Sequence, residues 1–187
     1  MVQHEPTTLS NSIQKAFSDA VQDVADFPRV GVLFKDLKGV WRDPRLCQKV
    51  VDAVARDIEA AGGADAVVGI ESRGFLLGMP LAMALGVPFL PARKGGKLPG
   101  PVFRTTYGLE YGEDVLELQA DGLDLLSRIW IHDDVLATGG TAEAAAKLVE
   151  MAGGRVAGFS FLLEIVPLKG RERLLDRGSV LPPMCSV

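Results

Sequence analysis

Short apolar runs alternate with helix-forming segments along most of this chain, and that alternation limits the fold more than any other feature. Four runs rich in Val, Ile, Leu and Phe have the length of buried strands, at 64–70, 87–93, 127–133 and 156–166. Helix-forming segments follow the first and third runs, at about 75–85 and 142–152. The succession predicts an α/β fold with a mostly parallel central sheet and helices on both faces.

The N-terminal part of the chain is predicted to be helical. Apolar residues three and four positions apart predict an amphipathic helix over 10–24. A second helix is predicted to begin at Asp43-Pro44, because proline suits the first helical turn, and to end at Gly62-Gly63. The last residues, "LPPMCSV", are expected to be an unstructured or packed tail.

One domain, 1–187, is expected, because no linker-like composition divides the chain. The net charge of −4 and pI of about 5.2 give no basic surplus, so we expect no nucleic-acid partner. No apolar run reaches the roughly 18 residues of a membrane span, and the N-terminus has no apolar signal core. Two isolated cysteines favour reduced thiols over a disulfide framework. A cytoplasmic protein without membrane partners is therefore expected.

The stretch "IHDDVLATGGTAEAAAK", residues 131–147, joins an apolar strand to an alanine-rich helix through a turn of small residues. Gly139 and Gly140 permit backbone angles and close approaches that other residues do not. Thr138 and Thr141 supply hydroxyl groups, and the helix start presents unpaired N–H groups with partial positive charge. The turn therefore predicts a phosphate-sized anion site.

Two aspartates, Asp133 and Asp134, stand just before this turn. They suit sugar hydroxyls, a Mg²⁺ ion held through water, or developing positive charge, rather than phosphate itself. A ligand with a phosphate at one end and a ribose diol in the middle would use both features. A plain Gly-Gly turn beside a solvated acidic pair stays open at this point. The sequence has neither a Walker A pattern nor a GxGxxG fingerprint.

Residues 94–112, "KGGKLPGPVFRTTYGLEYG", are rich in glycine and proline and have no helical period. We expect a long loop, of the kind that often closes over an active site as a lid. Four basic residues in and beside it favour an anionic ligand, namely Arg93, Lys94, Lys97 and Arg104.

Five sequence blocks together resemble the adenine phosphoribosyltransferase family, a branch of the type I phosphoribosyltransferases. They are "IWIHDDVLATGGT", "DFPRVGVLFKDL", "GIESRGFLLG", "ARKGGKLPGPV" and "YGLEYGEDVLELQ", and they occur in the family's order between about residues 26 and 176. The resemblance implies a sheet with flanking helices, a small N-terminal hood over the base, within about 1–37, and a flexible lid loop. It implies purine salvage, in which adenine and phosphoribosyl diphosphate (PRPP) give AMP and pyrophosphate with Mg²⁺, by a homodimer.

The resemblance also assigns roles to individual residues. It places the 5′-phosphate at Ala137, Thr138, Gly139, Gly140 and Thr141, and the ribose at Asp133 and Asp134. It places pyrophosphate at Arg73, Lys94 and Lys97, with Arg93 as an additional candidate, and adenine at Leu33, Phe34 and Lys35. It puts Glu110 and Tyr111 on the lid, with Tyr111 as a PRPP-binding residue and Glu110 as the group that takes or orients a proton of the base. It implies no direct protein ligand for Mg²⁺, and a cis peptide near Glu71–Ser72.

The chain also departs from the family pattern. Trp130 and His132 replace small aliphatic residues before the acidic pair; strand alternation puts them on one face, and we expect them to pack under a helix or at a subunit contact. Lys35 stands where arginine is common, which keeps the charge but not the fork geometry. Two other functions stay open: transfer to another purine base, and a regulator that senses PRPP or a nucleotide.

Overall fold

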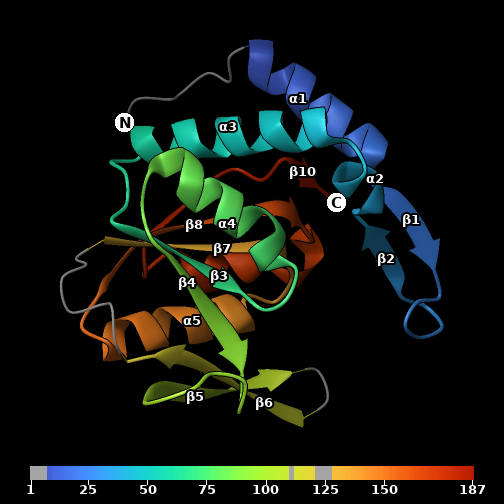
Figure 1. Cartoon of the computed structure of the whole chain (residues 1–187). Helices are drawn as coiled ribbons and strands as arrows, with labels where there is room; N and C mark the ends of the chain where they lie inside the picture. The colour runs from blue at the N-terminus through green and yellow to red at the C-terminus, as the bar shows by residue number, and fades with distance from the viewer. Residues whose placement is uncertain (1–7, 110–111, 121–127) are drawn as a thin grey trace.

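The computed structural model describes residues 8–109, 112–120 and 128–187. Within these ranges the main sheet has eight strands, and helices cover both of its faces, as expected (Figure 1). Five neighbouring strands run parallel, in the order β10 (Cys185–Ser186), β8 (Arg155–Glu164), β7 (Arg128–Leu136), β3 (Ala66–Ile70) and β4 (Phe89–Lys94). The short strand β9 (Ser179–Val180) pairs with β8.

The prediction of a long loop over 94–112 is wrong for the second half of that segment. There the chain forms β5 (Val102–Leu109), which pairs antiparallel with β6 (Gly112–Gln119) and extends the sheet beyond β4. Phe103 packs against the core and Tyr107 is buried, while Arg104 between them is exposed. This alternation is in the sequence, but the glycines and prolines of 95–101 obscure it, and the pairing with β6 decides the conformation.

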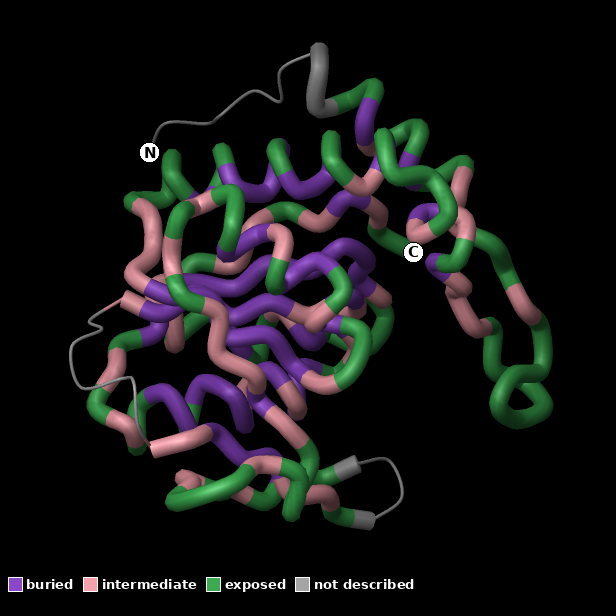
Figure 2. The backbone as a smooth tube through the Cα atoms, in the orientation of Figure 1, coloured by how far each residue is buried: buried purple, intermediate pink, exposed green. Residues whose placement is uncertain are grey.

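Two apolar clusters form the core, one on each face of the sheet. On one face lie α1 (Thr8–Ala20), α2 (Lys38–Trp41), α3 (Pro44–Ala60) and α4 (Gly74–Leu85). On the other face lie α5 (Gly140–Met151), part of the β5–β6 hairpin and α6 (Gly170–Leu174). The central strands between them are buried along most of their length (Figure 2). A 3₁₀ turn, η1 (Val166–Leu168), leads into α6.

The predicted N-terminal helix ends earlier than the apolar pattern suggested. It stops at Ala20, and the chain then forms β1 (Gln22–Ala25), which pairs antiparallel with β2 (Leu33–Asp36). Val24 therefore lies opposite Phe34 in a two-stranded hairpin instead of on a helical face. Ile13 and Phe17 anchor the helix in the core, and the strand pairing overrides the helical spacing beyond them.

The second predicted helix is confirmed, with its start as expected. Asp43 caps α3, because its Oδ1 accepts hydrogen bonds from the N–H groups of Arg45 (2.9 Å) and Leu46 (3.0 Å). The C-terminal tail is packed, since β10 pairs with β8. In the described part of the chain, no helix combines the length and apolar character needed to cross a membrane.

Candidate active site

The site lies where the chain changes direction across the sheet. From β3 the chain passes through α4 to β4 on one side, and from β7 it passes through α5 to β8 on the other. Because β3 and β7 are parallel neighbours, the turns that follow them lie side by side at their carboxyl ends. Open α/β sheets bind ligands at such a switch point. The two turns are close: a Cβ on Gly74 would lie 2.9 Å from Asp133 Oδ1.

Asp133 and Asp134 occupy the carboxyl-terminal part of β7, as the sequence suggested. Asp134 is 2% exposed, and Asp133 Oδ1 accepts a hydrogen bond of 2.9 Å from the Asp134 N–H. Asp134 Oδ2 is buried without a hydrogen bond of good geometry, but Arg73 Nε lies 2.8 Å from it as an ion pair. The two carboxylates are therefore held in a fixed place with one cation beside them.

Burial raises the pKa of both carboxyl groups. For Asp133, the charge of Asp134 adds to the effect of burial, while the Asp134 N–H and Arg73 oppose it. For Asp134, burial again raises the pKa, and Arg73 is the largest opposing influence. The ionised pair is thus costly in the free protein, and a positively charged or hydroxyl-bearing ligand would relieve that cost.

Arg73 connects the acidic pair to the N-terminal hairpin. Its guanidinium carbon lies 5.5 Å from the centroid of the Phe34 ring, within cation–π range, while its Nε pairs with Asp134. Phe27 meets the same ring edge-on at 5.1 Å. The expected base segment and the expected ribose carboxylates are therefore joined through one side chain. Leu33 is 51% exposed, and Lys35 Nζ lies 2.7 Å from Asp23.

The turn after β7 has the features of an anion site. Gly139, the residue just before α5, has φ +77°, and no side chain caps the helix, so the first N–H groups of α5 have no partner within the helix. A Cβ on Gly139 would lie 2.7 Å from the Gly170 carbonyl oxygen, so the position requires glycine for both angle and space. Thr138 is exposed and Thr141 is half-buried, while Ala137 leads in from β7. The five predicted residues are thus together in one turn.

The basic residues predicted for pyrophosphate are paired with carboxylates in this structure. Glu71 pairs with Lys97 and with Arg93 (3.2 Å), and it accepts the Lys94 N–H (3.0 Å). Lys94 Nζ lies 3.0 Å from Asp114. Burial acts to raise the pKa of Glu71, but these hydrogen bonds outweigh it and hold the pKa below its ordinary value. Any anion that takes the lysines must displace these carboxylates.

Glu71 and Asp114 were not identified from the sequence as partners of the basic residues predicted for pyrophosphate. In the "ESRG" turn the resemblance assigns a role to the arginine, but Glu71 is the residue that contacts the basic residues at the end of β4. Asp114 lies opposite Tyr107 in the β5–β6 ladder, and the Tyr107 hydroxyl donates to it at 3.3 Å. Only the register of β5 and β6 brings the side chains of Tyr107 and Asp114 together, so the sequence alone carried no signal for this contact.

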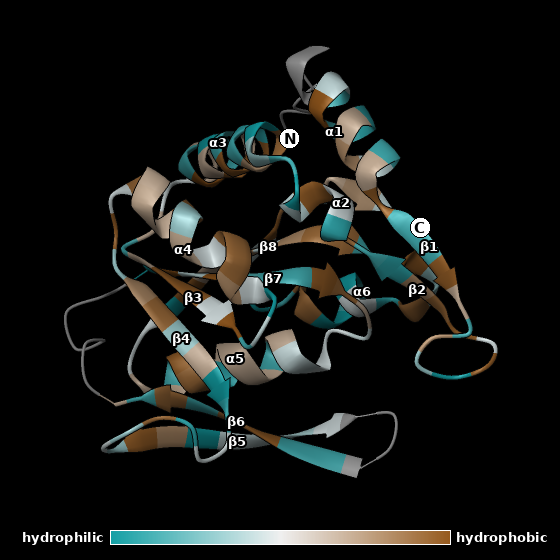
Figure 3. Ribbon diagram, turned by 45° about the vertical axis from the view of Figure 1, so that its right-hand side comes forward, coloured by the Kyte–Doolittle hydropathy of each residue, from teal (hydrophilic) through white to brown (hydrophobic). Residues whose placement is uncertain are grey.

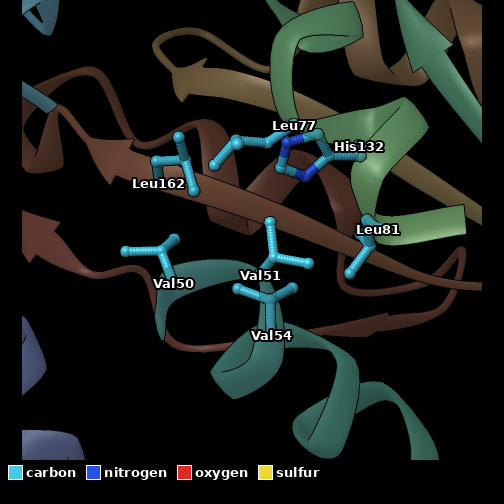
Figure 4. Close-up of a pocket in the computed structure, with 7 residues that line it drawn as sticks. All are labelled: Val50, Val51, Val54, Leu77, Leu81, His132 and Leu162. Carbon is cyan, nitrogen blue, oxygen red and sulfur yellow. The ribbon is translucent and has the colours of Figure 1, made fainter. Parts of the chain in front are cut away.

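Trp130 and His132 pack under helices, which confirms the first of the two expected placements. Trp130 Nε1 donates to Ser160 Oγ at 3.0 Å, and His132 Nδ1 lies 3.0 Å from the same oxygen. His132 lines an apolar cavity, without room for a water molecule, beneath α3 and α4 (Figure 4). Burial lowers the pKa of His132 to about 4, so its ring is neutral near pH 7.

Two further predictions concern the peptide bond between Glu71 and Ser72 and the lid residues Glu110 and Tyr111. The peptide bond Glu71–Ser72 is cis, as the resemblance implied. Glu110 and Tyr111 lie outside the described residues. Among residues 8–109, 112–120 and 128–187, no three His, Cys, Asp or Glu side chains gather as a metal site. The acidic pair offers carboxylate oxygens, and Asp134 Oδ2 accepts no hydrogen bond although it pairs with Arg73, so a Mg²⁺ ion near this pair would be held through ligand and water oxygens.

Comparison with known proteins agrees with this geometry. A scan against family models finds no match. Adenine phosphoribosyltransferases of Synechococcus sp. strain RCC307 and Gloeobacter violaceus are 45% and 49% identical to this chain, over 89% and 87% of it and 93% and 95% of their own lengths. The crystal structure of adenine phosphoribosyltransferase from Saccharomyces cerevisiae, 41% identical, superposes with a TM-score of 0.88 over 93% of this chain and 99% of that one. Relatives this similar along nearly their whole length show that the chain belongs to the adenine phosphoribosyltransferase family.

Proposed function

We propose that this protein transfers the phosphoribosyl group of PRPP to adenine, giving AMP and pyrophosphate in purine salvage. The observation that carries the proposal is the single switch point that joins the glycine turn after β7, the buried acidic pair and, through Arg73, the ring of Phe34. These groups match a ligand with a phosphate, a ribose and a flat base. The relative from Saccharomyces cerevisiae was crystallised with adenine, which supports the choice of base.

In this proposal each group has one task. The 5′-phosphate binds at Ala137, Thr138, Gly139, Gly140 and Thr141, through the free N–H groups and the two hydroxyls. Asp133 and Asp134 face the ribose hydroxyls and stabilise the positive charge that develops on the ribose as the bond to pyrophosphate breaks. Arg73, Lys94 and Lys97 stabilise the leaving pyrophosphate. Both effects grow as charge develops, which is the condition for catalysis.

The lysines exchange partners during this step. Lys97 leaves Glu71 and Lys94 leaves Asp114 when pyrophosphate is bound, so the free protein keeps these charges neutralised between turnovers. Arg73 likewise divides its guanidinium between Asp134 and the ligand. Because all three cations are between two-fifths and one-half exposed, their side chains can turn without unpacking the core.

Adenine is proposed to lie against the hood, at Leu33, Phe34 and Lys35. The Phe34 ring offers an apolar face, and backbone groups of the hairpin read the edge of the base. Lys35 is held by Asp23, so its side chain contributes less to base recognition than the backbone does. Glu110 and Tyr111 are proposed to close over the site from the lid, with Glu110 receiving or orienting the proton that the base loses.

Mg²⁺ belongs to the proposal as an ion held through substrate oxygens and water near Asp133 and Asp134. When bound, it neutralises pyrophosphate charge. A homodimer in the cytoplasm is also proposed. The outer face of α4 supports the dimer: the helix contains no charged residue, and Leu76, Met79 and Met83 are about half exposed or more. Figure 3 shows little teal on α4 where α1 and α3 carry much. The free cysteines Cys47 and Cys185 are consistent with a reducing compartment.

The test is turnover of PRPP and Mg²⁺ with adenine, hypoxanthine, guanine and xanthine, measuring nucleotide and pyrophosphate. The proposal expects AMP from adenine and little product from the other bases. Turnover of another base would keep the phosphate and ribose assignments and discard the adenine assignment. Binding of PRPP or AMP without any turnover would favour the regulator instead.

A further inference from the structure

The short helix α6 forms a second wall beside the phosphate turn. Gly170, its first residue, lies directly against this turn: a Cβ there would collide with the Ala137 carbonyl oxygen and lie 2.9 Å from the Gly139 N. The mutual lack of side chains at Gly139 and Gly170 lets the two backbones touch. The contact fixes where the following side chains of α6 fall relative to the start of α5.

Arg173 of α6 projects toward the first residue of α5. The point that a Cβ on Gly140 would occupy lies 3.5 Å from the Gly108 carbonyl oxygen of β5, 3.6 Å from Arg173 Nη1 and 3.7 Å from Thr138 Oγ1. A cation from one segment and a hydroxyl from another therefore approach the same spot, at the helix end where unpaired N–H groups begin. The Arg173 side chain is 51% exposed, so it can reach a ligand.

Among the described residues, Arg173 forms its hydrogen bond and ion pair through Nε, which leaves its outer nitrogens available. Its Nε donates to Glu143 Oε2 at 2.6 Å, and Glu143 stands in the first turn of α5. A carboxylate so close to a bound phosphate would repel it. Glu143 is instead surrounded by cations, since Lys147 Nζ lies at 3.3 Å and Arg177 Nη2 at 3.4 Å besides Arg173. Anchored through Nε, the guanidinium keeps two Nη groups to form a fork toward an anion.

We infer that Arg173 is a further binding residue for the 5′-phosphate, adding a fixed positive charge to the N–H groups and hydroxyls of the turn. The inference rests on the proposed function, because it places the 5′-phosphate of PRPP and AMP at residues 137–141. Neither the glycine turn nor the acidic pair indicates this arginine in the sequence. The packing of α6 on the turn is what brings it there.

Equilibrium titration with AMP and with adenosine tests the inference, because the two ligands differ only in the phosphate. We expect Arg173→Gln to weaken AMP binding about tenfold, the lower end for a hydrogen bond to a charged group, and to leave adenosine binding unchanged. Arg173→Lys keeps the charge without the fork and should weaken AMP about threefold. Arg177→Gln is the matched control, because Arg177 also pairs with Glu143 but is not placed at the turn; AMP binding should not change.

Three results would overturn the inference. A folded Arg173→Gln protein that binds AMP as wild type does would remove Arg173 from the phosphate site. Equal weakening of AMP and adenosine would assign it a structural role only. If the glutamine variant does not fold, the lysine variant decides, and wild-type AMP affinity there counts against the inference. A wild-type protein that binds neither AMP nor PRPP would instead refute the proposed function itself.

Discussion

At the scale of single residues, the feature that costs stability is a pair of adjacent carboxylates, one half-buried and one buried, beside the guanidinium of Arg73. Asp134 is 3% exposed in its side chain, and its partner Arg73 is 43% exposed. Such a pair is expensive to keep ionised without a ligand. This energetic cost is explained if the carboxylates stabilise a positive charge that exists only during the reaction.

Asp134→Asn should keep the fold and lose activity. Removing one charge-stabilising group of this kind costs about 10²–10³ in kcat, and the amide fits the same space. Steady-state kinetics with PRPP and adenine would measure the loss, and circular dichroism would confirm folding. Turnover near that of wild type in a folded Asp134→Asn protein would exclude the acidic pair from the mechanism.

Asp133→Asn should alter the pH dependence of stability in a defined direction. Burial, with the charge of Asp134, raises the pKa of Asp133 above 3.8, so the folded protein holds this proton more tightly than the unfolded chain does. Wild type therefore loses stability as pH rises from about the ordinary pKa of 3.8 through the raised pKa, and the asparagine variant, which keeps only Asp134 as a buried carboxyl group, loses less. The Tm of the variant minus that of wild type should increase from pH 4 to pH 7. A difference that stays flat or falls would mean that the carboxyl group is not penalised by burial.

At the scale of elements, helices and strands could be predicted from the sequence where one local pattern dominates. The strands β3 and β7, and the helices α3, α4 and α5, follow from apolar runs and helix signals that agree with one another. The strands β1 and β5 do not, because each depends on pairing with a strand that the local pattern does not reveal. Where helical spacing or glycine content competed with such pairing, the pairing decided.

In the phosphate turn, Gly139 is required both by its backbone angle and by the lack of space for a side chain. Gly139→Ala should lower stability by about 2 kcal/mol for the left-handed conformation, or roughly 4–8 °C in Tm at this size, and should raise the KM for PRPP. Gly153→Ala is the control, because Gly153 has φ +83° with no atom within 4 Å of its Cβ position. Gly153→Ala should lower stability for the same conformational reason but leave the KM for PRPP unchanged. An unchanged KM in a folded Gly139→Ala protein would contradict the phosphate assignment.

At the scale of the whole molecule, the uncharged outer face of α4 is the surface that a second copy would cover. If the protein is the proposed homodimer, light scattering should give about twice the 20.0 kDa chain mass for wild type. Met83→Glu places a charge on this face at a side chain that is 71% exposed, and should shift the mass toward the monomer. Met151→Glu, at an exposed methionine of α5, should not. A Met83→Glu protein as dimeric as wild type would move the interface elsewhere.

The sequence by itself determined the alternating architecture, the glycine turn, the acidic pair and, through five blocks in order, the family. These features are local, since each depends on residues that are neighbours along the chain. The tertiary structure alone decided that Arg73 joins Phe34 to Asp134, that Glu71 and Asp114 hold the lysines, and that Arg173 reaches the phosphate turn. Those contacts join segments that are distant in the chain, and only strand register and helix packing set which side chains meet.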